Sequence, residues 1–145
     1  MDRRRILLID DSQNDIELTL AALSRFNISN LVDVCRDGAE GLDYLHRQGS
    51  FADRPPETPG LVVLDLKMPR VGGLEVLRHI KSDARLRRIP TVVLTSSREE
   101  QDMTQSYEFG VNAYVVKPID SEEFLDAVHG LGAFWLELNQ VPPDL

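Results

Sequence analysis

The strongest constraint on the fold is an alternation of five short apolar runs with segments of helical periodicity. The runs cover residues 6–9, 31–35, 61–64, 91–94 and 113–116. Three of them consist almost entirely of Val, Ile and Leu, which is typical of strands covered on both faces in a parallel sheet. The second run carries Asp33 in its middle, which favours an edge position. This order predicts an α/β fold with right-handed crossovers between strands.

Several segments between the runs have readable helix ends. Ser12 stands three residues before Asp15, and Ser97 stands three before Glu100, two patterns typical of helix N-termini. Gly110 is expected to end the helix that follows Ser97, because glycine readily adopts the left-handed conformation found just after many helices.

The composition fits one globular domain with an acidic balance. The chain has 145 residues, of which 42% are hydrophobic and 28% are charged, and its formal net charge is −8 at pH 7. That charge disfavours non-specific binding to nucleic acids and to anionic membranes. Cys35 is the single cysteine and cannot form an internal disulfide, so we expect a cytoplasmic location and a small apolar role for its side chain.

One connection is longer than usual. Residues 49–60 contain Pro55, Pro56 and Pro59, and they span about twice the usual connection length. We expect a solvent-exposed surface loop here rather than a binding loop.

Polar side chains follow four of the five runs. Asp10 and Asp11 come after the first, Asp65 after the third, Thr95 after the fourth and Lys117 after the fifth. In an open parallel sheet, ligands bind at the carboxyl ends of the strands. Each residue alone has an ordinary explanation, such as a helix cap or a turn. Together they predict one cleft that contains three carboxylates, a hydroxyl and an ammonium group.

These groups are suited to phosphoryl transfer. Carboxylates that lie close together repel one another unless a cation joins them, and Mg²⁺ prefers oxygen ligands of this kind. Lys117 and the hydroxyl of Thr95 can donate to phosphoryl oxygens. A carboxylate can itself attack phosphorus, and neither a Ser–His nor a Cys–His pair follows these runs. We therefore expect Asp65, which ends the central run, to be the nucleophile.

Five ordered motifs resemble those of the receiver domains of two-component response regulators. They are Leu7-Leu8-Ile9-Asp10-Asp11-Ser12, Leu64-Asp65-Leu66-Lys67-Met68-Pro69 with Gly72-Gly73, Ile89-Pro90, Val92-Val93-Leu94-Thr95 and Ala113-Tyr114-Val115-Val116-Lys117-Pro118. The match spans about residues 4–135. It implies a flavodoxin-like three-layer sandwich with five helices and a five-stranded parallel sheet in the order 2-1-3-4-5. It also implies that residues 1–145 form a single receiver domain, with a C-terminal helix extension and tail at 132–145 and no output domain.

The resemblance assigns a role to each acidic residue of the cleft. It implies that Asp65 accepts a phosphoryl group from a histidine kinase or a phosphotransfer protein. It further implies that Asp11 and Asp65 ligate Mg²⁺ directly, with Asp10 acting beside them through water. The backbone carbonyl of Lys67 is implied as a further ligand.

The other motif residues form the signalling switch in this resemblance. The hydroxyl of Thr95 is implied to move toward the phosphoryl group while the ring of Tyr114 turns inward behind it. Lys117 is implied to bind the phosphoryl oxygens, and its bond to Pro118 is implied to be cis. Such a protein is no enzyme toward other substrates, because it catalyses only its own phosphorylation and dephosphorylation.

The last helix is expected to reach about residue 138 and to carry two apolar stripes. The stripe interpreted as core contains Phe124, Val128, Leu131, Trp135 and Leu138. Leu125 and Leu136 lie on a second stripe. With Tyr107 and Phe109 of the preceding helix, they form a hypothetical surface for a homodimer or another partner.

The chain end is similar to a subgroup of the family. The segment Phe134-Trp135-Leu136-Glu137 and the proline-rich loop are similar to those of single-domain receivers that pair with bacterial phytochromes. That similarity implies a bacteriophytochrome histidine kinase as phosphodonor, and a homodimer.

Three rival interpretations use a related fold. A Mg²⁺-dependent phosphohydrolase usually carries an acid two residues after its nucleophile, but that position is Lys67. A flavin or nucleotide module needs a Gly-rich or Ser/Thr-rich phosphate cradle after the first run, where this chain has the acidic segment 10–15. A scaffold that never carries phosphate is disfavoured because every expected polar residue is present.

Three histidines stand apart from this cleft. His46, His79 and His129 are distant from one another along the chain, and none follows an apolar run. Each is therefore expected to have a surface role rather than to bind a metal ion.

Overall fold

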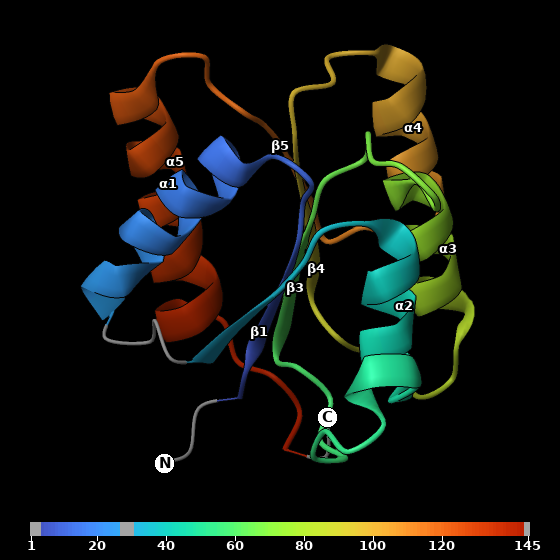
Figure 1. Cartoon of the computed structure of the whole chain (residues 1–145). Helices are drawn as coiled ribbons and strands as arrows, with labels where there is room; N and C mark the ends of the chain where they lie inside the picture. Colours follow the sequence, from blue (N-terminus) through green and yellow to red (C-terminus); the bar gives the residue numbers. More distant parts are fainter. Residues whose placement is uncertain (1–3, 27–30, 144–145) are drawn as a thin grey trace.

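A computed structural model describes residues 4–26 and 31–143 and confirms the predicted α/β fold (Figure 1). Its parallel sheet has five strands in the order β2-β1-β3-β4-β5. The strands are β1 (Ile6–Ile9), β2 (Val32–Cys35), β3 (Leu61–Leu64), β4 (Thr91–Thr95) and β5 (Ala113–Val116). Each strand agrees within one residue with an apolar run of the sequence. The strand that carries Asp33 lies at an edge of the sheet, as predicted.

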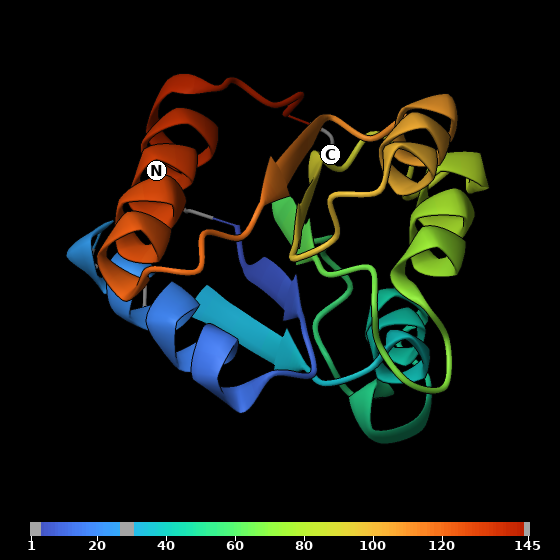
Figure 2. The same cartoon turned by 90° about the horizontal axis from the view of Figure 1, so that it is seen from above.

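The helices form a layer on each side of the sheet. They are α1 (Gln13–Leu23), α2 (Gly38–His46), α3 (Gly73–Ser82), α4 (Glu100–Glu108) and α5 (Ser121–Gly132). Figures 1 and 2 show α1 and α5 on one face, and α2, α3 and α4 on the other. Short 3₁₀ segments cover Ser24–Phe26 and Gly49–Phe51, and a π-helical segment, Ala133–Leu138, continues α5. Within the described ranges, no helix is both long enough and apolar enough to cross a membrane.

The strands supply both halves of the core because their side chains alternate between the two faces. Leu7 and Ile9 of β1 join the cluster under α2 and α3, whereas Ile6 and Leu8 join the cluster under α1 and α5. All four residues of β1 are almost completely buried, and the same is true of β3. Burial on both faces explains why these runs are continuously apolar rather than alternating.

Two of the three helix-end predictions are confirmed. The Ser12 hydroxyl accepts a hydrogen bond from the amide of Asp15 at 3.3 Å and caps α1. Gly110 has a φ of +98° and directly follows Phe109, the C-cap residue of α4, as expected. The capping pattern at Ser97 is wrong, because α4 begins later and Ser97 instead donates its hydroxyl to Asp102 at 2.6 Å.

The predicted core stripe of the last helix is confirmed for the residues in α5 but not for Leu138. Phe124, Val128 and Leu131 are buried and Trp135 packs partly against the core, but the side chain of Leu138 is 70% exposed. The π-helical turn at Ala133–Leu138 explains the difference, because its wider turn shifts residues away from the spacing of an α-helix.

The loop at 49–60 is exposed in part and anchored in part. Residues 52–53 and 55–57 are exposed, whereas Thr58 is buried. Arg54 stacks its guanidinium 4.2 Å from the centre of the Tyr44 ring and donates to the Tyr44 carbonyl at 2.8 and 3.0 Å. The loop is therefore held against the C-terminal half of α2.

Candidate functional site

The register of the sheet brings the residues that follow β1 and β3 together. Ile9, the last residue of β1, pairs with Leu64, the last residue of β3. Asp10 and Asp65 follow these residues, and the amide of Asp65 donates to the Ile9 carbonyl at 2.9 Å. Both carboxylates are buried, with exposed fractions of 1% for Asp10 and 6% for Asp65. The two acids therefore lie side by side at the carboxyl end of the sheet.

The same register places Lys117 at this end of the sheet. Thr95 pairs with Val116, and the amide of Lys117 donates to the Thr95 carbonyl at 2.7 Å. The described peptide bonds are all trans, so the expected cis bond between Lys117 and Pro118 is wrong. The trans form is the intrinsically preferred one even before proline, by about 0.5–1 kcal/mol.

The ammonium group of Lys117 connects three carboxylates. Its Nζ donates to Asp10 Oδ2 at 2.8 Å, to Asp15 Oδ2 at 2.9 Å and to Asp65 Oδ2 at 3.2 Å. The Lys117 side chain is only 6% exposed. The remaining oxygen of Asp10 accepts from the Ser12 amide at 3.0 Å, and that of Asp65 accepts from the Leu66 amide at 2.7 Å. The pocket is therefore fixed by backbone and side-chain bonds together.

Burial and charge act in opposite directions on these groups. Burial raises the pKa of Asp10, and the hydrogen bond and charge of Lys117 offset that rise only in part. Burial alone lowers the pKa of Lys117, but its bonds to Asp10 and Asp15 and the charge of Asp65 outweigh burial and raise it. Lys117 is therefore protonated at neutral pH. At Asp10, the positive charge of Lys117 does not fully compensate for the burial of the carboxylate.

Three of the acids are placed to share one cation. Asp10, Asp11 and Asp65 each offer a carboxylate oxygen, and these oxygens lie within 4.8 Å of one another. Asp11 is exposed, whereas the other two are buried. A set of carboxylate oxygens open to water on one side fits Mg²⁺, which keeps several waters beside one or two carboxylates. The predicted cluster of acids is therefore present and suits that ion.

Asp15 is the pocket residue that sequence reasoning missed. It was interpreted only as a capping partner of Ser12, yet its side chain bonds Lys117. The only signal in the sequence was its place in the acidic segment 10–15, which directly follows the first strand.

Lys67 directs its side chain away from the acids. Its Nζ lies 3.0 Å from Asp102 of α4, whose carboxylate also accepts the Ser97 hydroxyl at 2.6 Å. The Ser97 bond, and after it Lys67, holds the pKa of Asp102 below its usual range against the effect of burial. The segment after β3 is therefore linked directly to the helix after β4.

Thr95 and Tyr114 meet at the same segment. Thr95 is completely buried, and its Oγ1 accepts from the Ser97 amide at 3.3 Å. The hydroxyl of the half-buried Tyr114 donates to the Ser97 carbonyl at 3.1 Å. Burial raises the pKa of Tyr114, so its hydroxyl stays a donor at neutral pH. The two predicted switch residues thus hold one short stretch of backbone between them.

Gly73 allows the helix after Asp65 to begin close to the pocket. A Cβ atom at this position would lie 2.1 Å from the carbonyl oxygen of Asp65. Its amide donates to the Leu66 carbonyl at 2.9 Å. A larger residue at the start of α3 would therefore displace the backbone that carries Asp65.

Comparison with known proteins identifies the family. Residues 6–129 match the family model of the response regulator receiver domain. The chain belongs to this family. The receiver is 39% identical over 137 residues to the response regulator Rcp1 of Synechocystis sp., and the alignment covers 94% of this chain and 92% of Rcp1.

Solved structures of other receivers superpose on this one. The phosphorylated cyanobacterial phytochrome response regulator RcpA does so with a TM-score of 0.92 and 38% identity, over 97% of this chain and 99% of RcpA. The Mn²⁺-bound form of Rcp1 gives 0.90 and 38%, over 96% and 99% of the two chains. The bacteriophytochrome response regulator AtBRR gives 0.75 and 53%, over 97% and 100%. Receiver domains bind a divalent metal ion, and the acidic cluster of this receiver has ligands of the right kind.

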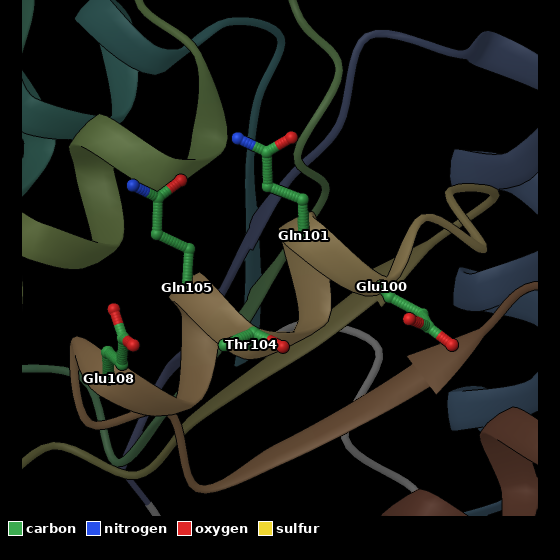
Figure 3. A pocket seen from close by; sticks show the side chains of 5 residues that line it. All are labelled: Glu100, Gln101, Thr104, Gln105 and Glu108. Carbon is green, nitrogen blue, oxygen red and sulfur yellow. The ribbon is translucent and has the colours of Figure 1, made fainter.

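A hollow on α4 of the receiver lies outside this pocket. It is lined by Glu100, Gln101, Thr104, Gln105 and Glu108. Figure 3 shows Gln101 and Gln105 pointing toward α3, whereas Glu100 points away from it. The hollow is open and contains no basic group that would hold a phosphoryl oxygen. The hollow therefore differs from the acidic pocket both in its lining and in its place in the fold.

Proposed function

We propose that this receiver acts alone and accepts a phosphoryl group on Asp65, with Mg²⁺, from a histidine kinase or a phosphotransfer protein. The observation that carries the proposal is the buried contact of Lys117 Nζ with Asp10 and Asp65 beside the exposed Asp11. Action as a single receiver domain, residues 1–145, is supported by the alignment that covers 92% of Rcp1.

The proposed transfer moves the phosphoryl group from a histidine of the donor to Asp65 in one displacement. A carboxylate oxygen of Asp65 attacks the phosphorus of a phosphohistidine, a new O–P bond forms, and the P–N bond breaks. The imidazole leaves with the electron pair and takes a proton from water. Asp11, Asp65 and the backbone carbonyl of Lys67 would hold Mg²⁺, with Asp10 beside them through water, and the ion would neutralise charge on the phosphoryl oxygens. Lys117 then exchanges a carboxylate for a phosphoryl oxygen.

The contacts of Lys67 support a phosphoacceptor over a phosphohydrolase. A hydrolase acting on other substrates needs an acid near this position to protonate the leaving group. Lys67 instead holds Asp102, and that contact raises the pKa of its ammonium group further. The proposed receiver therefore catalyses only its own phosphorylation and dephosphorylation.

We place the switch at Thr95 and Tyr114. Phosphorylation adds about −1.5 to −2 charges and three strong acceptors near the hydroxyl of Thr95. Movement of that hydroxyl toward the phosphoryl group releases the Ser97 amide, and Tyr114 then loses its carbonyl partner. Because Ser97 also bonds Asp102 of α4, the surface near α4 changes with it.

The proposed partner is a bacteriophytochrome histidine kinase in the cytoplasm. It is supported by the names of the similar proteins RcpA and AtBRR. The net charge of −8 continues to disfavour nucleic acid and anionic membrane as partners.

A homodimer through α4 and α5 is proposed on a narrower surface than the sequence suggests. Tyr107 is 55% exposed, but Phe109, Leu125 and Leu136 already pack partly against the core. Light scattering on a Tyr107→Glu variant tests this surface, because Tyr107 is its exposed member. A dimer with unchanged mass in the phosphorylated variant would contradict it.

Intact-mass measurement with Mg²⁺ and a small-molecule phosphodonor tests the acceptor. The wild type and an Asp126→Asn control, changed at an exposed aspartate of α5, should each gain one phosphoryl group. Asp65→Asn should gain none. An equal gain in Asp65→Asn would exclude Asp65 as the acceptor.

A further inference from the structure

Two histidines from different helices face each other at the end of the molecule remote from the acidic pocket. His46 is the last residue of α2, and His79 lies in the last turn of α3. Their Nε2 atoms lie 2.6 Å apart, and their rings are nearly perpendicular, at 89°. Figure 1 shows these helices side by side, ending away from the strand ends that carry the pocket. The two histidines, which the sequence places far apart, are therefore contact partners on the half-buried surface between α2 and α3.

A carboxylate completes this group. Asp83 follows α3 directly, and one ligand atom from each of His46, His79 and Asp83 lies within 4.8 Å of the others. All three side chains are half-buried, so they are partly shielded from water but open to an ion. Two imidazoles and one carboxylate are the ligands of many zinc sites that keep a fourth position for water.

We propose that His46, His79 and Asp83 form a binding site for a transition-metal ion, best matched by Zn²⁺, between the ends of α2 and α3. Imidazole nitrogen suits Zn²⁺, whereas Mg²⁺ prefers an octahedron of oxygens. The site is thus chemically distinct from the acidic pocket and does not compete with it for the same ion.

The geometry of the histidine pair needs little change to admit the ion. Without a metal ion, one Nε2 carries a proton and donates a hydrogen bond to the other Nε2, which must be unprotonated. With Zn–N bonds of about 2.0–2.1 Å and tetrahedral angles, the two nitrogens would lie roughly 3.3 Å apart. The rings therefore separate by less than about 1 Å, a shift that half-buried side chains can make.

Asp83 is held in a conformation that leaves one oxygen for the metal. Its Oδ1 accepts the amides of Arg85 at 2.8 Å and Leu86 at 3.1 Å, which fixes the carboxylate at the end of α3. Burial raises the pKa of Asp83, but these two amides outweigh burial and lower the pKa.

One neighbouring charge opposes the ion. The guanidinium of Arg85 is close enough to lower the pKa of Asp83 further, and it donates to the Leu45 carbonyl at 2.6 Å. That bond directs the positive charge toward the C-terminal end of α2, where it is favourable. A bound ion would join His46 of α2 to His79 of α3, and we expect it to hold the two helices together.

Isothermal titration with Zn²⁺ in excess Mg²⁺ tests the site, because Mg²⁺ keeps the acidic pocket filled. The wild type should bind one Zn²⁺ per chain. His46→Gln and His79→Gln should each weaken binding by more than about tenfold. Asp83→Asn should do the same while keeping the amide-bound Oδ1. His129→Gln is the matched control, since His129 stacks on Phe26 with ring centres 4.9 Å apart and should leave binding unchanged.

Two further measurements separate this site from the acidic pocket and from misfolding. Asp11→Asn should lose Mg²⁺ affinity and keep Zn²⁺ affinity; loss of Zn²⁺ binding in this variant would overturn the proposal. In the wild type, Zn²⁺ should shift the ring proton resonances of two of the three histidines and raise the unfolding temperature. Unchanged histidine resonances, or His46→Gln and His79→Gln that bind as the wild type does, would also overturn it.

Discussion

The acidic pocket and the histidine cluster lie at opposite ends of the sheet and are built in different ways. The pocket takes its groups from residues that directly follow strands, and a permanent cation, Lys117, is part of it. The histidine cluster takes its groups from the ends of two helices, and its own ligands can form a neutral pair. The first arrangement gathers several carboxylates around one ammonium group, whereas the second contains a single carboxylate, Asp83, whose Oδ1 is bound by two backbone amides.

This difference has consequences for stability. Asp10 and Asp65 are among the most buried polar groups of the described residues, and they have Lys117 as a common partner. Removing one member of a buried ion pair leaves a charge without compensation. His46 and His79 are half-buried and can each return to water as neutral rings. The pocket should therefore depend on its charges far more than the histidine cluster depends on its contact.

The largest effect is expected for Lys117→Met, which keeps an unbranched side chain and removes the charge. Without Mg²⁺, the free energy of unfolding should fall by about 3–5 kcal/mol, because two buried carboxylates lose their cation. His79→Gln should lose no more than about 1.5 kcal/mol. Urea unfolding of both variants measures the contrast.

Mg²⁺ and pH sharpen this contrast. Added Mg²⁺ should restore part of the stability of Lys117→Met, since an ion that binds only the folded state stabilises it. The loss should also shrink as the pH falls, because the pKa of Asp10 is raised by burial and the acid can take up a proton. A metal-free loss below about 1 kcal/mol would contradict the comparison.

The two ends also differ in how far the sequence predicts them. A parallel strand ends where its apolar run ends, so Asp10, Asp65 and Lys117 could be assigned to one edge from the runs alone. His46 and His79 are 33 residues apart, and their contact depends on how α2 and α3 rotate and pack, which no local sequence pattern indicates. The fold and most of the pocket were therefore predictable.

The remaining differences also arise from packing. Ser97 lies close enough to Asp102 to bond it, and so it does not cap α4 as its spacing from Glu100 predicts. Asp15 was missed because a residue in a first helical turn has two plausible uses, a cap or a pocket ligand. Only the position of Lys117 decides between them.

A smaller effect is expected at the edge strand, where Asp33 has a permanent partner instead of a metal. It accepts Arg5 Nε at 2.6 Å and Nη2 at 2.8 Å, together with the Tyr44 hydroxyl. Burial raises the pKa of Asp33, but Arg5 and Tyr44 outweigh it and lower the pKa. Because the Arg5 side chain is 41% exposed, water screens the pair. We expect Asp33→Asn to lose about 1–2 kcal/mol at neutral pH.

The sign of the pH dependence follows from the lowered pKa. The stability that Asp33 contributes is complete above the pKa of an unfolded aspartate and is lost as the pH falls through the lower folded value. The wild type and Asp33→Asn should therefore converge in acid and separate toward neutral pH, with or without Mg²⁺. Parallel curves of unfolding free energy against pH, or a Mg²⁺-dependent difference, would contradict this assignment.

The smallest effect is expected for Asp15→Asn, which tests whether the third carboxylate bound by Lys117 is structural or competes with phosphate. The side chain is 24% exposed, and asparagine keeps an oxygen for Lys117 while the Ser12 cap uses only the backbone amide. Stability should therefore change by less than about 0.5 kcal/mol.

Phosphorylation by a small-molecule donor should become about twofold to fivefold faster in Asp15→Asn. Lys117 is then held less strongly, and one charge that repels the phosphoryl group is gone. Mass spectrometry over time measures the rate, and Zn²⁺ affinity should stay constant. A slower reaction would contradict this expectation. It would mean that the bond from Asp15 positions Lys117 for the transfer.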